Sequence, residues 1–368
     1  MEISDHDLVL ILKNAGTACN IGCKYCAEAR KKLVKLSEDT IVTFDDVDML
    51  MKQTASVENV TVLFHGGEPL LLSIEYYDKI IKKWRQQRDD VYFGFQTNAT
   101  LIDDEWLDFF ETNRDIVGIS ISLDGDESAN SNRKGKDGKP TYPDVIRALE
   151  KLQSRNLTTG MIATLTQEAL GREQELFDIV SKFSNIRFLK LNPCYDMWSD
   201  GSVPEWGILP NEYAQFVINF FNIMFDNHYF GKLNVEPSLS IIKSLEGIEN
   251  SFCNFCEKKC SHFLSVYPGG RVIACDNFTL EDGMYPNLYD QDSIEELLKK
   301  KPQPLFDQLD SLLAKCESCG YQSICHGGCL AVRRRYLLYG KNGEGQLYCT
   351  EMQRVIEFIK SRIEGVRK

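Results

Sequence analysis

Six short runs of apolar and mostly β-branched residues recur along the first half of the chain. They are LVLILK (8–13), VTVLF (60–64), VYFGFQ (91–96), IVGISIS (116–122), GMIATLT (160–166) and IRFLKL (186–191). Runs of this length and composition are typical of strands that are buried on both faces of a sheet. The sequence therefore predicts six buried strands.

Apolar residues recur at helical spacing between these runs. The predicted helices span 44–55, 73–87, 103–112, 143–155 and 171–184. Strands that alternate with helices indicate an α/β fold with a parallel sheet, either open and doubly wound or closed as an incomplete (β/α)6 TIM-like barrel. In both cases functional residues are expected at the carboxyl ends of the strands.

The pattern changes after about residue 205. Helices are expected at 211–229, 236–247 and 350–365, and the region between the last two is rich in cysteine and poor in long periodic segments. We therefore expect a catalytic domain over 1–235 and a smaller, loop-rich domain over 236–368.

Composition and charge narrow the class of protein. The chain has 368 residues, 43% of them hydrophobic, and a net charge of −12, which argues against a nucleic-acid partner. Apolar runs are too short to span a membrane, and the N-terminus lacks the basic segment of a signal peptide, so we expect the protein to be located in the cytoplasm. Thiols stay reduced there, so 13 cysteines indicate metal ligation rather than disulfides.

The segment CNIGCKYC, directly after the first predicted strand, carries three of these cysteines: Cys19, Cys23 and Cys26. A structural zinc site wants four ligands, and three thiolates on a four-iron cluster leave one iron open. A partial zinc site or three unrelated thiols are the alternatives. The C-x3-C-x2-C spacing resembles that of the radical SAM superfamily. In these enzymes the open iron binds S-adenosylmethionine, and reductive cleavage of S-adenosylmethionine gives a 5′-deoxyadenosyl radical.

The resemblance extends to other segments in chain order, among them HGGEP (65–69), QTNAT (96–100) and SISLDG (120–125). It implies that a set of residues contacts S-adenosylmethionine. This set is Tyr25 by the adenine, Gly66, Gly67 and Glu68 in the loop for the amino group, Ser122 at the ribose, Arg133 at the carboxylate and Tyr195 through its backbone.

The later cysteines resemble the SPASM pattern of radical SAM enzymes, which implies two auxiliary 4Fe–4S clusters and three clusters in all. By this resemblance one cluster takes Cys253, Cys260, Cys275 and Cys329, and the other takes Cys316, Cys319, Cys325 and Cys349. Cys256 competes with Cys253 for the first position, and zinc ribbons are the alternative use of C-x2-C pairs. Cys194 matches no cluster motif and is expected to be a small buried side chain.

The layout resembles enzymes that modify peptides or proteins. We expect a ribosomal peptide maturase that oxidises or cross-links a peptide, through a thioether or carbon–carbon bond. The alternative is an anaerobic sulfatase-maturating enzyme that forms formylglycine from Cys or Ser, to which the layout is most similar. A sugar dehydrogenase with auxiliary clusters and a non-catalytic zinc scaffold are lesser alternatives.

The resemblance also implies a catalytic base and partners. Asp276, directly after Cys275, aligns with the base of the sulfatase-maturating enzymes. Three residues depart from their pattern, since His65 replaces Gln, Ala99 replaces Gly and Ala27 replaces an aromatic residue. The expected partners are a peptide or protein substrate, a reductant such as flavodoxin or ferredoxin, and a separate leader-binding protein for a peptide substrate.

Overall fold

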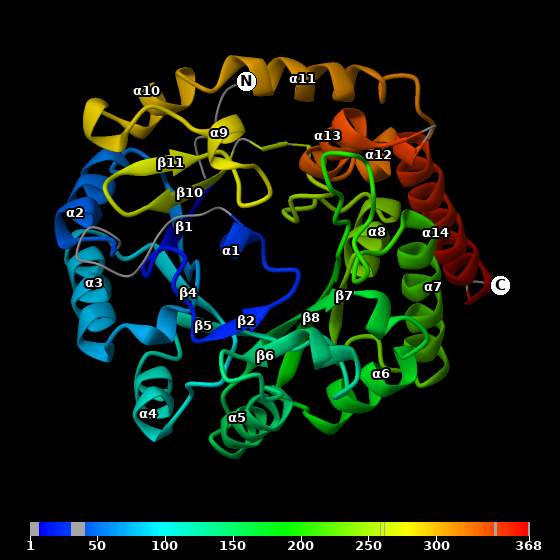
Figure 1. Cartoon of the computed structure of the whole chain (residues 1–368), viewed down its shortest axis with the longest axis horizontal. Coiled ribbons are helices and arrows are strands. Elements are labelled where there is room, and N and C mark those ends of the chain that lie inside the picture. The colour runs from blue at the N-terminus through cyan, green and yellow to red at the C-terminus, as the bar shows by residue number, and fades with distance from the viewer. Residues whose placement is uncertain (1–6, 31–40, 258, 261, 342–343, 367–368) are drawn as a thin grey trace.

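The structure is a computed structural model that describes residues 7–30, 41–257, 259–260, 262–341 and 344–366. Its central element is one curved sheet around the middle of the molecule, with helices outside it (Figure 1). In spatial order its strands are β11 (Arg271–Ile273), β10 (Phe263–Tyr267), β1 (Asp7–Lys13), β3 (Asn59–His65), β4 (Val91–Thr97), β5 (Val117–Ser122), β7 (Thr159–Leu165), β8 (Ile186–Pro193) and β9 (Asn234–Glu236).

The six strands predicted from the apolar runs are β1, β3, β4, β5, β7 and β8. They pair in parallel and in chain order, without the reversal that defines a doubly wound sheet. The prediction of a partial TIM-like barrel is thus confirmed, and the doubly wound alternative is wrong. The helices that connect these strands are α2 (Phe44–Gln53), α3 (Ile74–Gln87), α4 (Asp104–Thr112), α5 (Tyr142–Ser154) and α6 (Glu173–Lys182).

Local sequence explains where these helices start. The Thr43 hydroxyl accepts from the Asp46 amide, and the Asp46 carboxylate accepts from the Thr43 amide, which closes a capping box at α2. At α3 and α4 the helix start is capped by a single side-chain oxygen, that of Ser73 and that of Asp103, without the reciprocal bond. Each cap satisfies backbone donors that a helix start would otherwise leave without partners.

An aromatic cluster joins β3 and β4 to the helices outside them. Phe64 and Phe95 have ring centroids 4.8 Å apart, and Tyr77 lies 4.8 Å from both rings. Trp106 and Phe110 extend the cluster to α4. Tilted and edge-to-face contacts of this kind add to the burial of apolar area and fix the helices against the sheet.

The second half of the chain contains more helix than its sequence predicts. Its helices are α7 (Pro210–Asp226), α8 (Ser238–Leu245), α9 (Leu280–Gly283), α10 (Ile294–Lys299), α11 (Gln303–Ala314), α12 (Gln322–Cys325), α13 (Leu330–Tyr339) and α14 (Glu344–Val366). The helices α7, α8 and α14 were expected, whereas α11 and α13 were missed. Three arginines interrupt the apolar pattern of α13, yet Arg333 is buried because its guanidinium donates to Leu312 O and Gly327 O.

The sheet continues from the first half of the chain into the second. β10 pairs in parallel with β1, with Ser265 opposite Ile11, and β11 pairs antiparallel with β10. The division at residue 235 falls inside β9 and stays a prediction. The pairing of β10 with β1 has a functional consequence, because it brings Asp276, shortly after β11, within reach of the side chain of Lys13, the last residue of β1.

Within the described residues, none of the helices has both the length and the apolar character that a bilayer crossing needs.

Candidate active site

The first three cysteines lie beyond the carboxyl end of β1. There β2 (Ile21–Cys23) pairs antiparallel with β6 (Arg133–Gly135), which places Cys23 opposite Arg133. The Cys26 amide donates to Cys23 O at 3.2 Å, and both Cys19 and Cys26 lie close enough to Cys23 to act on its charge. The structure therefore gathers the three thiols, and their binding to iron stays a prediction.

Burial raises the pKa of the Cys23 thiol to about 12, an effect that the nearby Arg133 only partly offsets. Burial also raises the pKa of Cys19. Because iron binds the thiolate, these thiols must release protons when a cluster forms.

Arg133 belongs to a buried polar group beside these thiols. Its Nη1 donates to the Tyr25 hydroxyl at 2.9 Å, and that hydroxyl donates to Asp124 Oδ2 at 2.5 Å. Burial alone would lower the pKa of Arg133, but Tyr25, Cys23 and Asp124 raise it well above its usual value. The guanidinium therefore remains charged.

The Nε atom of Arg133 is buried and has no hydrogen-bond partner among the described residues. A buried donor without a partner costs about 1–3 kcal/mol, and a carboxylate would satisfy it. The residues thus fit the expected cofactors: Cys19, Cys23 and Cys26 would hold a cluster with one open iron, and Arg133 would bind the carboxylate of S-adenosylmethionine.

The loop HGGEP packs directly on the cysteine loop. The Gly67 amide donates to Gly16 O at 3.0 Å, and the Glu68 amide donates to Ala18 O at 2.7 Å. A Cβ atom on Gly67 would lie 1.7 Å from Ala18 O, and Gly66 has a φ of +125°. The two glycines are therefore required by the close approach of two protein loops, whatever ligand they bind.

Glu68 is buried, and other residues already occupy its carboxylate. Oε1 accepts from Thr97 Oγ1 at 2.6 Å and Oε2 accepts from the Asn98 amide at 2.8 Å. Burial raises its pKa, and these hydrogen bonds partly offset the effect. Glu68 joins the loop after β3 to the end of β4, and a contact with the cofactor stays a prediction.

Ser122 and Tyr195 are placed at the ends of β5 and β8. The Ser122 hydroxyl accepts from Gln96 Nε2 at 3.0 Å, which orients it. The Tyr195 ring lies edge-on to Tyr213, Tyr336 and Tyr348, and its carbonyl accepts from Arg335 Nη1 at 2.6 Å. Tyr195 thus links the barrel to α13, and its contact with the adenine stays a prediction.

The predicted base contacts a buried lysine that no sequence pattern indicated. Lys13, the last residue of β1, has no exposed side-chain surface. Its Nζ lies 2.6 Å from Asp276 Oδ2, 3.2 Å from Glu28 Oε1 and 2.9 Å from His65 Nδ1. The structure thereby brings Asp276 to the carboxyl end of β1, where the fold predicts function.

The partners of Lys13 are held in turn by β10. The Ser265 hydroxyl donates to Asp276 Oδ1 at 2.5 Å, and the Tyr267 hydroxyl donates to Glu28 Oε2 at 3.1 Å. We call Lys13, Glu28, His65, Ser265, Tyr267 and Asp276 the Lys13 network. It joins β1, β3 and β10 with α1 (Ala27–Arg30) and the turn after β11.

The cysteines of the second half form two groups. Cys253 and Cys260 are neighbours, and each lies close to Cys275 and Cys329. Cys256 is buried and its thiol points to Cys253 O at 3.5 Å. These positions favour Cys253 as the first ligand, which stays a prediction.

The other four thiols converge on one small cavity of about 30 Å³. The residues that line it include Cys316, Cys319, Cys325, Cys349 and Arg333. Arg333 Nη1 donates to Cys316 Sγ at 3.2 Å. Hydrogen bonds to ligating sulfur and a nearby cation are ordinary means of tuning a cluster potential. This donor set fits the second auxiliary cluster.

Within the described part of the chain, no three His, Cys, Asp or Glu side chains are arranged to bind one metal ion. The thiolates of a four-iron cluster each bind a different iron, so they need not converge on one point. Cys194, which matches no cluster motif, is buried.

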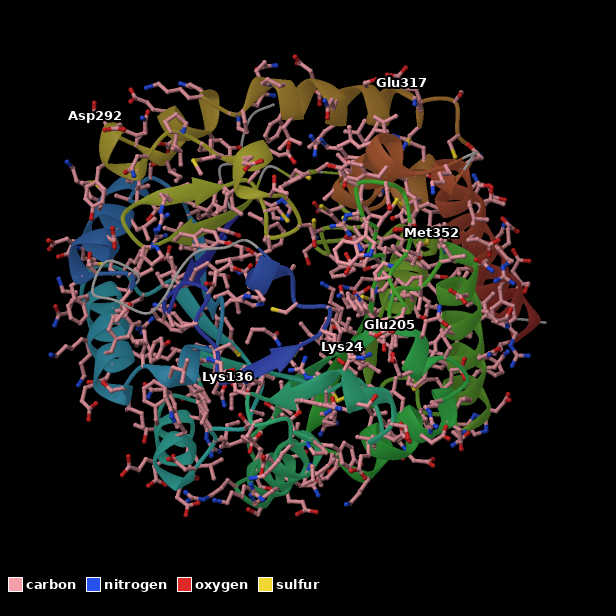
Figure 2. The ribbon with its side chains drawn as sticks, viewed as in Figure 1. Lys24, Lys136, Glu205, Asp292, Glu317 and Met352 are labelled. Atoms are coloured by element: carbon pink, nitrogen blue, oxygen red, sulfur yellow. The ribbon has the colours of Figure 1, made fainter. Side chains whose placement is uncertain are left out.

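Two surface features involve none of the predicted residues. A larger cavity of about 600 Å³ opens between α6, α7 and α14 and contains none of them. Across the barrel opening, Lys24 of the cysteine loop lies 3.1 Å from Glu205 in the segment after β8, and Figure 2 shows the two labelled side chains together.

Comparison with known proteins agrees with this geometry. The profile of the radical SAM superfamily matches residues 14–177, which include the cysteine loop, HGGEP and Arg133. The chain carries a radical SAM domain. The predicted cofactors, S-adenosylmethionine and 4Fe–4S clusters, are thereby confirmed, whereas the number of three clusters stays a prediction.

Relatives match most of the chain, including the part beyond the radical SAM domain. The chain is 25% identical to the cysteine-type anaerobic sulfatase-maturating enzyme of Clostridium perfringens over 369 residues, which cover 98% of each chain. It is also 25% identical to the serine-type enzyme of Bacteroides thetaiotaomicron over 352 residues, which cover 88% of this chain and 82% of the relative.

Solved structures show the same fold. One is described as native anSMEcpe with bound AdoMet, with a TM-score of 0.83 at 23% identity over 98% of both chains. Another is SuiB of Streptococcus suis bound to precursor peptide SuiA, with a TM-score of 0.65 at 17% identity over 94% of this chain and 77% of that one.

Proposed function

We propose that the protein is an anaerobic sulfatase-maturating enzyme, which oxidises one cysteine or serine of a sulfatase to formylglycine. The observation that carries this proposal is the match to the Clostridium perfringens enzyme over 98% of both chains. The chain is therefore similar to that enzyme beyond the radical SAM domain, and the similarity includes the cysteine-rich half.

This proposal replaces the main expectation from the sequence. Peptide cross-linking in ribosomal peptide maturation is unconfirmed, and the similarity to SuiB leaves part of that chain unmatched. Modification of a peptide or protein substrate is common to both functions. The flavodoxin or ferredoxin reductant, the separate leader-binding protein and the cytoplasmic location stay predictions.

The roles of the chain's own residues follow from the site. When bound, S-adenosylmethionine and the clusters would supply the radical that removes a hydrogen atom from the substrate and would take up the remaining electron. A proton must also leave the substrate side chain. Asp276 is the group we assign to accept it, because its carboxylate is fixed by Lys13 and Ser265 at the barrel opening.

The test is anaerobic reconstitution with a peptide that spans the target cysteine of a sulfatase. Mass spectrometry should show CHO in place of CH₂SH, whereas a thioether cross-link would show only the loss of two hydrogens. Asp276→Asn should cleave S-adenosylmethionine at the wild-type rate without forming the aldehyde. An unchanged yield in this variant would remove Asp276 as the base, and a cross-linked product from the wild type would overturn formylglycine formation.

A further inference from the structure

Lys13 occupies a position at which a lysine is costly unless its charge is used. Its side chain is fully buried at the end of β1. Desolvation of an ammonium group costs several kcal/mol, which close carboxylates repay only with good geometry. Burial alone would lower the pKa of Lys13, but Asp276 and Glu28 more than offset this effect, so its pKa is raised and the ammonium remains protonated.

The contacts of Lys13 account for all three of its N–H donors. They reach Asp276 Oδ2 at 2.6 Å, His65 Nδ1 at 2.9 Å and Glu28 Oε1 at 3.2 Å. An ammonium group has three donors and no acceptor. Each contact can therefore be a donated hydrogen bond, and together they fix the direction of the lysine head.

The same contacts orient His65. Because an ammonium group can only donate, His65 Nδ1 is the acceptor in its contact with Lys13. The Nδ1 atom also lies 3.6 Å from Asp276 Oδ2. Lys13 thus orients the ring that stands beside the predicted base.

We propose that Lys13 is the positioning residue of the reaction, because its ammonium holds the Asp276 carboxylate and the His65 ring where a substrate proton is taken up. The proposal rests on the function proposed above. It deepens that function by naming the residue that places the base. The contacts of Lys13 lead to Asp276, His65 and Glu28, so we expect its loss to affect removal of the substrate proton rather than generation of the radical.

The first experiment compares Lys13→Met with Lys82→Met in the reconstituted holoenzyme. Lys82 is a matched control, since its Nζ also lies 2.6 Å from an aspartate, Asp78, but on the exposed face of α3. The readout is modified peptide, whether aldehyde or cross-link, per 5′-deoxyadenosine formed. A carboxylate misplaced by 1 Å costs about 100-fold, so this ratio should fall by about that factor in Lys13→Met and stay unchanged in Lys82→Met.

Loss of the cation leaves the buried Glu28 carboxylate and the partly buried Asp276 carboxylate without it, so Lys13→Met alone can fail to fold. The double variant Lys13→Met/Glu28→Gln removes one of these charges and should fold with the same loss in the ratio. A merely structural lysine would lower 5′-deoxyadenosine and product together. An unchanged ratio in the folded variant therefore overturns the proposal.

The second experiment does not depend on turnover. It measures the unfolding temperature of holoenzyme that carries Lys13→Met, Asp276→Asn or both changes. The double variant should lower this temperature by less than the sum of the two single variants, because both changes break the same pair. Additive shifts would overturn the proposal even if the wild type makes no product. Absence of formylglycine from the wild type would instead overturn the proposed function, so the two failures are distinguishable.

Discussion

Gly67→Ala should separate the loop HGGEP from the cysteine loop. A Cβ on Gly67 would lie 1.7 Å from Ala18 O, 2.3 Å from its carbonyl carbon and 2.7 Å from its nitrogen. All three are backbone atoms, so no side-chain rotation can relieve the contact. Ordinary van der Waals contact begins at 3.4 Å, so one loop must move by the difference, about 1.7 Å.

The cost can be worked from the contacts that such a movement breaks. The hydrogen bonds from the Gly67 amide to Gly16 O and from the Glu68 amide to Ala18 O would both be lost. Each contributes about 0.5–1.5 kcal/mol, and the forced overlap adds about 1–3 kcal/mol. We expect a loss of about 2–6 kcal/mol in the free energy of unfolding. Cys19 follows Ala18 directly, so the thiols should also be displaced.

The assay is iron content after anaerobic reconstitution, together with thermal unfolding. Gly22→Ala is the matched control, since Gly22 lies in the same cysteine loop and a Cβ there meets no atom within 4 Å. Gly67→Ala should bind less iron and unfold at a lower temperature, whereas Gly22→Ala should match the wild type in both. Wild-type iron content and stability in Gly67→Ala would refute the close approach of the two loops.

Two further predictions concern the backbone at Ala99 and the ligands of the first auxiliary cluster. Ala99 has a φ of +63°, a conformation that costs an L-residue roughly 1–2 kcal/mol. Ala99→Gly should therefore destabilise the protein by about 2 kcal/mol less than Ala148→Gly in α5, as measured by denaturant unfolding. Equal losses of stability in the two variants would contradict this. Cys253→Ser should lower the iron content by about a third, because one of three four-iron clusters is lost, whereas Cys256→Ser should retain it. The reverse result would assign Cys256 as the ligand.

Local patterns predicted much of the barrel. Each of the six strands is marked by its own apolar run, because one face of the strand is fully buried and the other is partly covered, as the alternating burial along β3, β5 and β7 shows. The helix starts at Thr43, Ser73 and Asp103 are local as well, since a cap depends on residues three positions apart. Cysteine spacing identified the first cluster loop because Cys19, Cys23 and Cys26 also lie close together in the sequence.

Other features depend on contacts that no local pattern records. Arg333 interrupts the apolar pattern of α13, and its burial depends on two carbonyls outside that helix. The conformation at Ala99 and the contact between Gly67 and Ala18 arise where separate loops meet.

The sequence by itself therefore determined the six barrel strands, the helices between them and the cysteine motifs, and its resemblance to the sulfatase-maturating enzymes indicated Asp276 as a candidate base. Only the tertiary structure decided what surrounds that base. Lys13 and Asp276 are 263 positions apart in the chain and meet because β10 pairs with β1. A lysine at the end of a strand is ordinarily exposed, and it can be buried here only because Glu28 and Asp276, from two other segments of the chain, supply carboxylates that compensate its charge.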